Sequence, residues 1–269
     1  VAVWILVTLV IFVILFVFHN YFKKIFSKWF TWIVFLLILA CAVVWSFITY
    51  LPDGKLHIQL VENGDDSTLV IRDPRGKVIV FDPAKSVNEL SAEISRQLSP
   101  WDFSIDEAWH TRRASVSSLE LFQERIPISK SVLTPAVYMA GADQRPLRVP
   151  QNIELVKLAP GGEREYPSGM LIRLAGEDQD RSALSIEYGE IRILVPNGVD
   201  YALIRETSPA LLDDLTVVIL QEEDISYIPP RVWQALEPQI ILWNSTALSP
   251  SVDWPGNDVN RRISISTDG

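Results

Sequence analysis

Cysteine is almost absent from this sequence of 269 residues, and the only one is Cys41. A single cysteine excludes a disulfide within the chain and a zinc site built from cysteines. Histidine is nearly as scarce, with His19, His57 and His110. The chain is therefore neither a small disulfide-stabilised scaffold nor a cysteine-ligated metalloprotein.

Acidic residues are missing from residues 1–50, where the only basic residues are Lys23, Lys24 and Lys28. Two apolar runs fill this part, Val1–Phe18 and Trp29–Tyr50. At ~1.5 Å per residue the first run spans ~27 Å, and the second is longer, so each can cross most of a bilayer core. We predict a transmembrane hairpin of two helices in residues 1–50. Because the chain opens inside an apolar run without methionine, we expect it to be the end of a longer membrane region.

The three lysines lie in the short loop between the two apolar runs. Short loops rich in lysine stay in the cytoplasm, so the second helix would run outward. We therefore expect a multi-pass protein of the bacterial cytoplasmic membrane, with lipid around the helices and residues 51–269 on the extracytoplasmic side. The alternative is that three lysines do not decide the orientation when further helices precede them.

Residues 51–269 form an acidic domain. Without the three lysines of the apolar part, 21 of the 24 basic residues remain against 33 acidic ones, a net charge of −12. Phosphate backbones are bound by clustered lysine and arginine, so this composition argues against strong DNA binding by the isolated domain.

Alternating and fully apolar segments in this domain predict many short strands with helices between them. The predicted strands are residues 55–61, 68–72, 77–81, 105–110, 154–158, 170–174, 182–188, 191–195, 216–220, 239–243 and 262–266. The predicted helices are residues 87–98, 115–125, 201–212 with a break near Pro209, and 231–236. Strands interspersed with helices, and no internal repeat, indicate an α/β or α+β fold with sheets inside and helices outside.

The order of these segments carries a family resemblance. The segments are Glu62–Thr68, Phe81–Ala84, Pro100–Asp102, Trp109–Ser115, Arg181–Leu184, Pro196–Gly198 and Gln221–Asp224. In this order and spacing the chain resembles the C-terminal metallo-β-lactamase-like domain of ComEC-type competence proteins, which move DNA across the bacterial membrane. The resemblance covers most of the chain from Leu51 and implies an αββα sandwich after membrane helices.

The resemblance also implies which metal ligands this sequence lacks. The family's metal loop reads Thr-His-Pro-Asp-Ala-Asp-His, and here Trp109–Ser115 reads Trp-His-Thr-Arg-Arg-Ala-Ser. Only His110 is kept, while Arg112, Ala114 and Ser115 stand where ligands are implied. Three histidines in the chain are too few to rebuild such a site, and a metal is what would activate water. We predict a pseudoenzyme and assign no catalytic, cofactor-binding or metal-binding residue.

For several side chains the sequence leaves two roles open. His110 is a catalytic base or a structural side chain at a strand end, and Asp82 is a remnant of the active site or a turn cap before Pro83. The cluster Glu222, Glu223 and Asp224 is a site for a hard cation or a solvated loop. Ser115, Ser117 and Ser118 lie near His110, but no acid is placed to complete a triad. The pairs Arg112–Arg113 and Arg261–Arg262 contact phosphate or form surface ion pairs.

Three classes of function follow. The first is a non-catalytic, membrane-anchored domain with a structural or accessory role in DNA uptake, which handles DNA only within a larger membrane assembly. The second is an extracytoplasmic binding or scaffold domain without a link to DNA. The third is a hydrolase with an atypical site.

Overall fold

The computed structural model describes residues 28–50, 52–63, 66–83, 91–92, 94, 104–117, 119–139, 150–220, 232, 238–243 and 264–267. The chain divides into two compact units, Val1–Leu51 and Pro52–Gly269. The predicted helices at residues 87–98 and 231–236 fall almost entirely outside the described residues, as do the first apolar run and the lysine loop up to Ser27.

In the first unit the structure describes one helix, α2 (Lys28–Tyr50). Cys41 is exposed on it. Its exposed large apolar side chains are Trp32, Phe35, Leu36, Leu37, Ile38, Leu39, Val43, Val44 and Trp45. Among the described residues, no helix combines the length and the apolar character that a membrane crossing requires. The two transmembrane helices remain a prediction.

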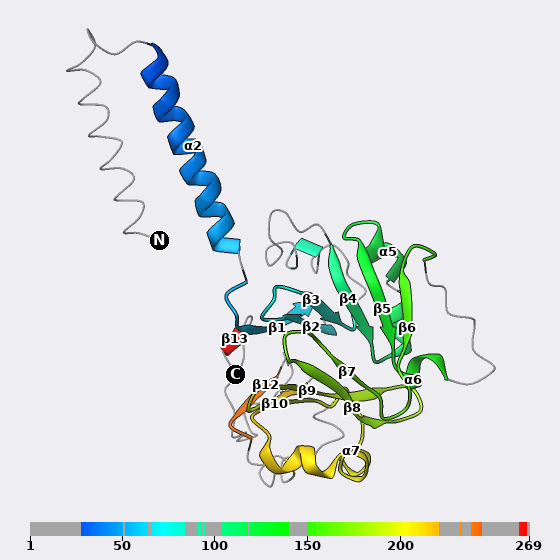
Figure 1. Ribbon diagram of the computed structural model, residues 1–269. Coiled ribbons are helices and arrows are strands. Elements are labelled where there is room, and N and C mark those ends of the chain that lie inside the picture. The colour runs from blue at the N-terminus through cyan, green and yellow to red at the C-terminus, as the bar shows by residue number, and fades with distance from the viewer. Residues whose placement is uncertain are drawn as a thin grey trace. The chain divides into compact units, whose positions relative to one another are not determined.

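The second unit contains two sheets that face each other (Figure 1). The seven-stranded sheet has the order β13-β1-β2-β3-β4-β5-β6. Its strands are β1 (Leu56–Asn63), β2 (Asp66–Arg72), β3 (Val78–Phe81), β4 (Ile105–His110), β5 (Ile128–Leu133), β6 (Glu154–Lys157) and β13 (Ser264–Thr267). Strands β13, β1, β2 and β3 are antiparallel neighbours, whereas β3, β4, β5 and β6 run parallel.

The six-stranded sheet has the order β12-β11-β10-β9-β8-β7. Its strands are β7 (Glu163–Glu165), β8 (Leu171–Glu177), β9 (Ser182–Tyr188), β10 (Ile191–Val195), β11 (Val217–Leu220) and β12 (Ile240–Trp243). Strands β7 to β10 are antiparallel, and β10, β11 and β12 are parallel.

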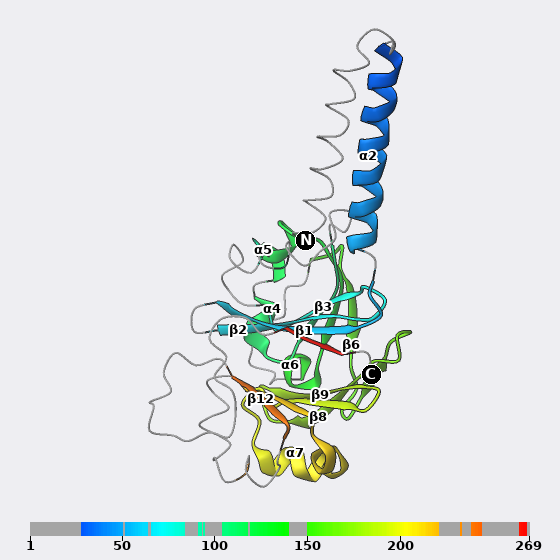
Figure 2. The same ribbon diagram turned by 90° about the vertical axis from the view of Figure 1, so that its left-hand side faces the viewer.

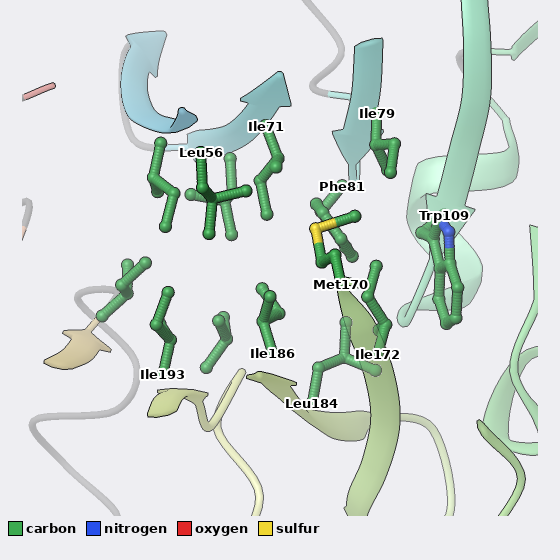
Figure 3. Close-up of a cluster of buried hydrophobic side chains, with 14 of the residues drawn as sticks. Leu56, Ile71, Ile79, Phe81, Trp109, Met170, Ile172, Leu184, Ile186 and Ile193 are labelled. Carbon is green, nitrogen blue, oxygen red and sulfur yellow. The ribbon is translucent and has the colours of Figure 1, made fainter. Parts of the chain in front are cut away.

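Apolar side chains from both sheets fill the layer between them. In Figure 3, Leu56, Ile71 and Ile79 of one sheet point toward Ile186 and Ile193 of the other. Trp109 of β4 is fully buried in the same cluster. At ~25 cal/mol per Å² of buried apolar surface, this layer is the main source of the unit's stability.

Helices cover the outer faces of the two sheets, as the layers in Figure 2 show. On the seven-stranded sheet, Leu119 and Phe122 of α5 (Leu119–Gln123) pack into a second apolar cluster. On the six-stranded sheet, Ile204 of α7 (Tyr201–Thr207) and Leu211 of the 3-10 helix η1 (Pro209–Asp214) belong to a third cluster. The predicted αββα sandwich is therefore correct for this unit.

Most predicted elements lie where the sequence placed them, with two kinds of difference. Strands β5 and β7 and the short helix α6 (Pro135–Tyr138) were not predicted. The predicted helix at residues 115–125 is two short helices, α4 (Arg113–Val116) and α5. The predicted break near Pro209 is correct, because α7 ends at Thr207 and η1 begins at Pro209.

Candidate functional site

Three strand ends meet where the resemblance places a metal centre. Strands β3 and β4 are parallel, so their last residues, Phe81 and His110, lie at the same edge of the sheet. The loop after β10 approaches from the other sheet. Asp82 follows β3 with φ 46° and Asn197 follows β10 with φ 53°. Left-handed backbone at a non-glycine residue costs free energy, so other contacts must hold both residues in place.

The buried carboxylate of Asp82 is surrounded by donors from the loop after β4. Its Oδ1 accepts hydrogen bonds from the backbone N–H of Thr111 at 2.8 Å and of Arg112 at 3.2 Å. Its Oδ2 accepts a hydrogen bond from the Thr111 hydroxyl and lies 4.0 Å from Nε of Arg112. A carboxylate with donors on both oxygens is satisfied without a metal ion.

Thr111 connects Asp82 to Asn197. Its hydroxyl donates to Asp82, and the same oxygen accepts a hydrogen bond from Nδ2 of Asn197 at 3.0 Å. Nδ2 also donates to the Ser182 carbonyl at 3.0 Å, which fixes the orientation of the amide because a carbonyl only accepts. Asp82, Thr111 and Asn197 are all buried. We call these three residues the hub.

His110 is fully buried beside the hub, and its contacts determine its tautomer. Nδ1 lies 2.9 Å from Oγ of Ser115, whose hydroxyl donates to the Arg112 carbonyl at 2.7 Å. Since that hydroxyl has one proton, Nδ1 must carry the proton of the imidazole. Nε2 then holds a lone pair, and it has no hydrogen-bond partner among the described residues. Burial lowers the pKa of His110 to about 4, although Asp82 opposes the shift, so the ring is neutral at pH 7.

Two arginines flank the hub. Arg112 and Arg181 face each other in an antiparallel bridge between the loop after β4 and the start of β9. The guanidinium of Arg181 lies against the α-carbon of Gly198, where a Cβ would collide with Nη1. A side chain at position 198 would displace this guanidinium, and the backbone of Gly198, with φ +79°, also favours glycine. Both arginines have an acidic neighbour, since Nε of Arg112 lies 4.0 Å from Asp82 and Nε of Arg181 lies 3.8 Å from Asp180.

The described residues of this edge do not fit a divalent metal centre. His110 offers one nitrogen ligand, Asp82 is satisfied by its donors, and Arg112 places a positive charge beside the carboxylate. A catalytic zinc site needs three protein ligands around an open position. Among the residues that the structure describes, no group of three or more His, Cys, Asp or Glu side chains could hold a metal ion.

The structure brings some of the candidate residues together and separates others. Asp82, His110 and Ser115 gather at the edge, and Asp82 binds the β4 loop rather than only its own turn. Ser117 is exposed and donates to the Ala114 carbonyl. Ser115 is not placed as a nucleophile, because its proton is held by a carbonyl. The remaining candidates, Ser118, Arg261, Arg262, Glu222, Glu223 and Asp224, lie outside the described residues.

The segments that contain Thr111, Asn197 and Arg181 were part of the resemblance, but sequence reasoning assigned none of these three side chains a role at this edge. Thr111 and Asn197 are 86 residues apart. The available signal was the Pro196–Asn197–Gly198 turn directly after an apolar strand, since asparagine and glycine tolerate left-handed backbone.

A second polar cluster lies at the other end of β3 and was also missed. Glu107 of β4 is fully buried, and its carboxylate accepts hydrogen bonds from Lys77 at 2.9 Å, Arg164 at 2.7 Å and Tyr166 at 2.7 Å. The Trp109 indole N–H donates to the Tyr166 oxygen at 3.1 Å. Burial raises the pKa of Glu107, but Arg164, Tyr166 and Lys77 outweigh burial together and leave it below the ordinary value.

No family model matches the chain, and no curated protein matches it. Solved structures do match. The metallo-β-lactamase fold protein YhfI from Bacillus subtilis superposes with a TM-score of 0.54 at 7% identity, over 80% of this chain and 100% of that one. The CmlA beta-hydroxylase gives a TM-score of 0.46 at 11% identity, over 79% of this chain and 54% of that one. The zinc-bound PqqB from Methylobacterium extorquens gives 0.41 at 15%, over 66% and 61%.

The likeness to YhfI shows the fold of the second unit. The second unit has a metallo-β-lactamase fold, and the first of the three similarities carries that assignment. At 7% identity it shows the fold alone.

Proposed function

We propose that this chain is a non-catalytic, membrane-anchored domain of the ComEC type, with a structural or accessory role in moving DNA across a bacterial membrane. The observation that carries the loss of catalysis is the state of Asp82. Its two oxygens are occupied by Thr111 and by the backbone N–H of Arg112, and a guanidinium stands beside it. Without a metal to activate water, phosphodiester hydrolysis is immeasurably slow.

The proposal of a membrane anchor is supported by α2. After Lys28 this helix has no charged residue, and large apolar side chains such as Trp32, Leu37 and Trp45 are exposed on it. A helix that is apolar on all sides is stable when lipid or protein surrounds it. We propose a bacterial cytoplasmic membrane as the location, with residues 51–269 on the outer side.

A nuclease assay tests the proposal. The full chain, purified in detergent, is incubated with single- and double-stranded DNA and with manganese, zinc, magnesium or calcium, and a β-lactam substrate is tested in parallel. We expect no turnover. Metal-dependent cleavage that disappears in His110→Ala would contradict the loss of catalysis and would favour a hydrolase with an atypical site, for which the unpartnered Nε2 of His110 is the available base.

Protease accessibility tests the location. Protease added to intact spheroplasts should digest the acidic domain, and membranes washed with carbonate should retain α2. A domain that is protected until the membrane is permeabilised would place it on the cytoplasmic side. Filter binding at low salt tests the accessory role. We expect no tight DNA binding by the acidic chain alone, because few phosphates could be neutralised, and tight binding would contradict a role that is confined to a larger membrane assembly.

A further inference from the structure

The hub connects both sheets through side chains and backbone at once. Thr111 follows β4 of the seven-stranded sheet, and Asn197 follows β10 of the six-stranded sheet. The Thr111 carbonyl also accepts a hydrogen bond from the backbone N–H of Ser182, the first residue of β9, at 3.1 Å. The two sheets are therefore joined by polar contacts at this edge as well as by the apolar layer.

Asp82 extends the connection to three strands of its own sheet. Its backbone N–H donates to the Trp109 carbonyl of β4 at 2.8 Å, and its carbonyl accepts from the Thr68 hydroxyl of β2 at 3.2 Å. Asp82 itself follows β3. Asp82 and Asn197 both have left-handed backbone, and the side chains of both hydrogen-bond to the same Thr111 hydroxyl.

A metal centre would perform the same task in a different way. A bound ion ties loops from separate strands together, and its binding free energy becomes folding free energy. Here the donors around Asp82 and the guanidinium of Arg112 supply the positive electrostatic environment that an ion would supply. A carboxylate that already accepts these hydrogen bonds would have to give them up to bind a cation, and the guanidinium would repel the cation.

We infer that the hub is a metal-independent clasp between the two sheets, that the Thr111 hydroxyl is its shared atom, and that Arg112 provides the charge that a metal ion would otherwise provide. This inference goes beyond the proposed function, because it holds whether or not the chain handles DNA.

The first test asks whether the folded chain takes up metal. The full chain in detergent is titrated with zinc and manganese by calorimetry, and its thermal unfolding is followed with and without a strong chelator. We expect no stoichiometric uptake and an unchanged midpoint, because removing a ligand lowers the midpoint only where the native state binds it. One equivalent of bound zinc, or a midpoint that falls by several degrees in chelator, would overturn the inference.

The second test removes the shared hydroxyl. Thr111→Val keeps the shape but leaves the Asp82 carboxylate and the Asn197 amide without this partner, so we expect the midpoint to fall by about 5 °C. Thr111→Ser keeps the hydroxyl and should stay within ~2 °C of the original chain. Thr207→Val, an exposed threonine at the end of α7, is the matched control and should not change the midpoint.

Asn197→Gly gives an independent measurement if Thr111→Val does not fold. Glycine tolerates the backbone of Asn197, so only the side-chain hydrogen bonds are lost, and we expect a lower midpoint. The double variant should lose less than the sum of the two single losses, because both remove the same bond. A Thr111→Val chain as stable as the original, or a Thr111→Ser chain as unstable as Thr111→Val, would overturn the role of the hydroxyl.

Arg112→Gln and Arg113→Gln test the charge. Both substitutions remove one positive charge from adjacent residues, Arg112 before α4 and Arg113 at its first position, and Nε of Arg112 lies 4.0 Å from the Asp82 carboxylate. We expect Arg112→Gln to lower the midpoint more than Arg113→Gln does, and Arg112→Lys to restore part of the loss. Equal effects of the two Gln variants would contradict the role of Arg112. A nuclease-active chain with an intact clasp would contradict the proposed function but not this inference.

Discussion

Asp82 and Glu107 are two buried carboxylates at opposite ends of the parallel strands β3 and β4, and they are stabilised in different ways. Lys77 precedes β3 and binds Glu107, whereas Asp82 follows β3. Glu107 is neutralised by two cationic side chains and Tyr166. Asp82 depends mainly on two backbone N–H groups and the Thr111 hydroxyl.

The partners of the two carboxylates differ in how easily they can turn to water. Lys77 and Arg164 are 29% and 26% exposed, so either can turn to water if Glu107 is removed. The backbone N–H groups at Asp82 cannot move away, because the loop after β4 positions them. We therefore expect the Asp82 end to be more sensitive to substitution than the Glu107 end, although Glu107 carries the stronger ion pairs.

The largest effect should come from Asp82→Ala. This change leaves buried donors at Thr111 and Arg112 without an acceptor and places alanine at a φ of 46°, so we expect a loss of about 4 kcal/mol in the free energy of unfolding. Urea denaturation of the full chain in detergent measures it.

Asp82→Asn is the matched control, since asparagine keeps the shape and tolerates the backbone. Its NH₂ group would face the Thr111 oxygen, which already accepts from Asn197. We expect an intermediate loss. An Asp82→Ala chain within ~1 kcal/mol of the original would mean that water satisfies these donors and that the comparison with Glu107 does not hold.

The strands that lead to the edge with Asp82 and His110 were predicted well from the sequence. Apolar and alternating runs located the strands that end at Phe81, His110 and Val195, because a strand buried on a face must repeat its side chains with a period of two. The metallo-β-lactamase-like fold followed from the order of the elements. His110, Asp82 and Ser115 were correctly singled out as residues near the edge.

The sequence could not predict the contacts that complete the edge. Asn197 reaches Thr111 across 86 residues, and this contact depends on how two sheets stack, which no local pattern encodes. Strand β5 was missed because Lys130 and Ser131 interrupt its apolar pattern, although the parallel pairing with β4 and β6 holds it in place. Glu107 reads as a polar residue of an alternating strand, but Lys77 and Arg164 let it be buried.

Because His110 is buried at the Asp82 end of β3 and β4, it should make the free energy of unfolding depend on pH. Its pKa is lowered from 6.5 to about 4 in the folded chain, so between these values the unfolded chain binds a proton that the folded chain does not. The free energy of unfolding should therefore fall as the pH falls from 6.5 toward 4, by roughly 3 kcal/mol in total, and be unaffected by this group above 6.5.

His110→Asn is the appropriate comparison, because its NH₂ group can still donate to Ser115 and does not titrate. Urea denaturation at several pH values should show a flatter profile for this variant between pH 6.5 and 5. Parallel profiles of the two chains in this range would contradict the assignment of a buried, neutral imidazole.

Glu107→Gln should have a smaller effect than Asp82→Ala. Glutamine keeps the size and one acceptor for Tyr166, while Lys77 and Arg164 can reach solvent, so we expect a loss of about 2 kcal/mol. Because the pKa of Glu107 lies below its ordinary 4.5, its contribution is present above pH 4.5 and lost as the pH falls below that value. A larger loss than that of Asp82→Ala, measured in the same urea series, would reverse the comparison.

The smallest effect should come from the ion pair of Lys130 and Glu154, which has the same N–O distance as that of Lys77 and Glu107 but is more exposed to water. Lys130 of β5 is the register partner of Glu107, and its ammonium lies 2.9 Å from Glu154 of β6, the same distance that separates Lys77 from Glu107. Lys130 and Glu154 are 36% and 59% exposed, so water and salt screen their attraction. We expect Glu154→Gln to cost at most about 0.5 kcal/mol and to become neutral at high salt, whereas the Glu107→Gln loss should persist there. Equal losses for the two Gln variants at low and high salt would show that burial does not distinguish the two pairs.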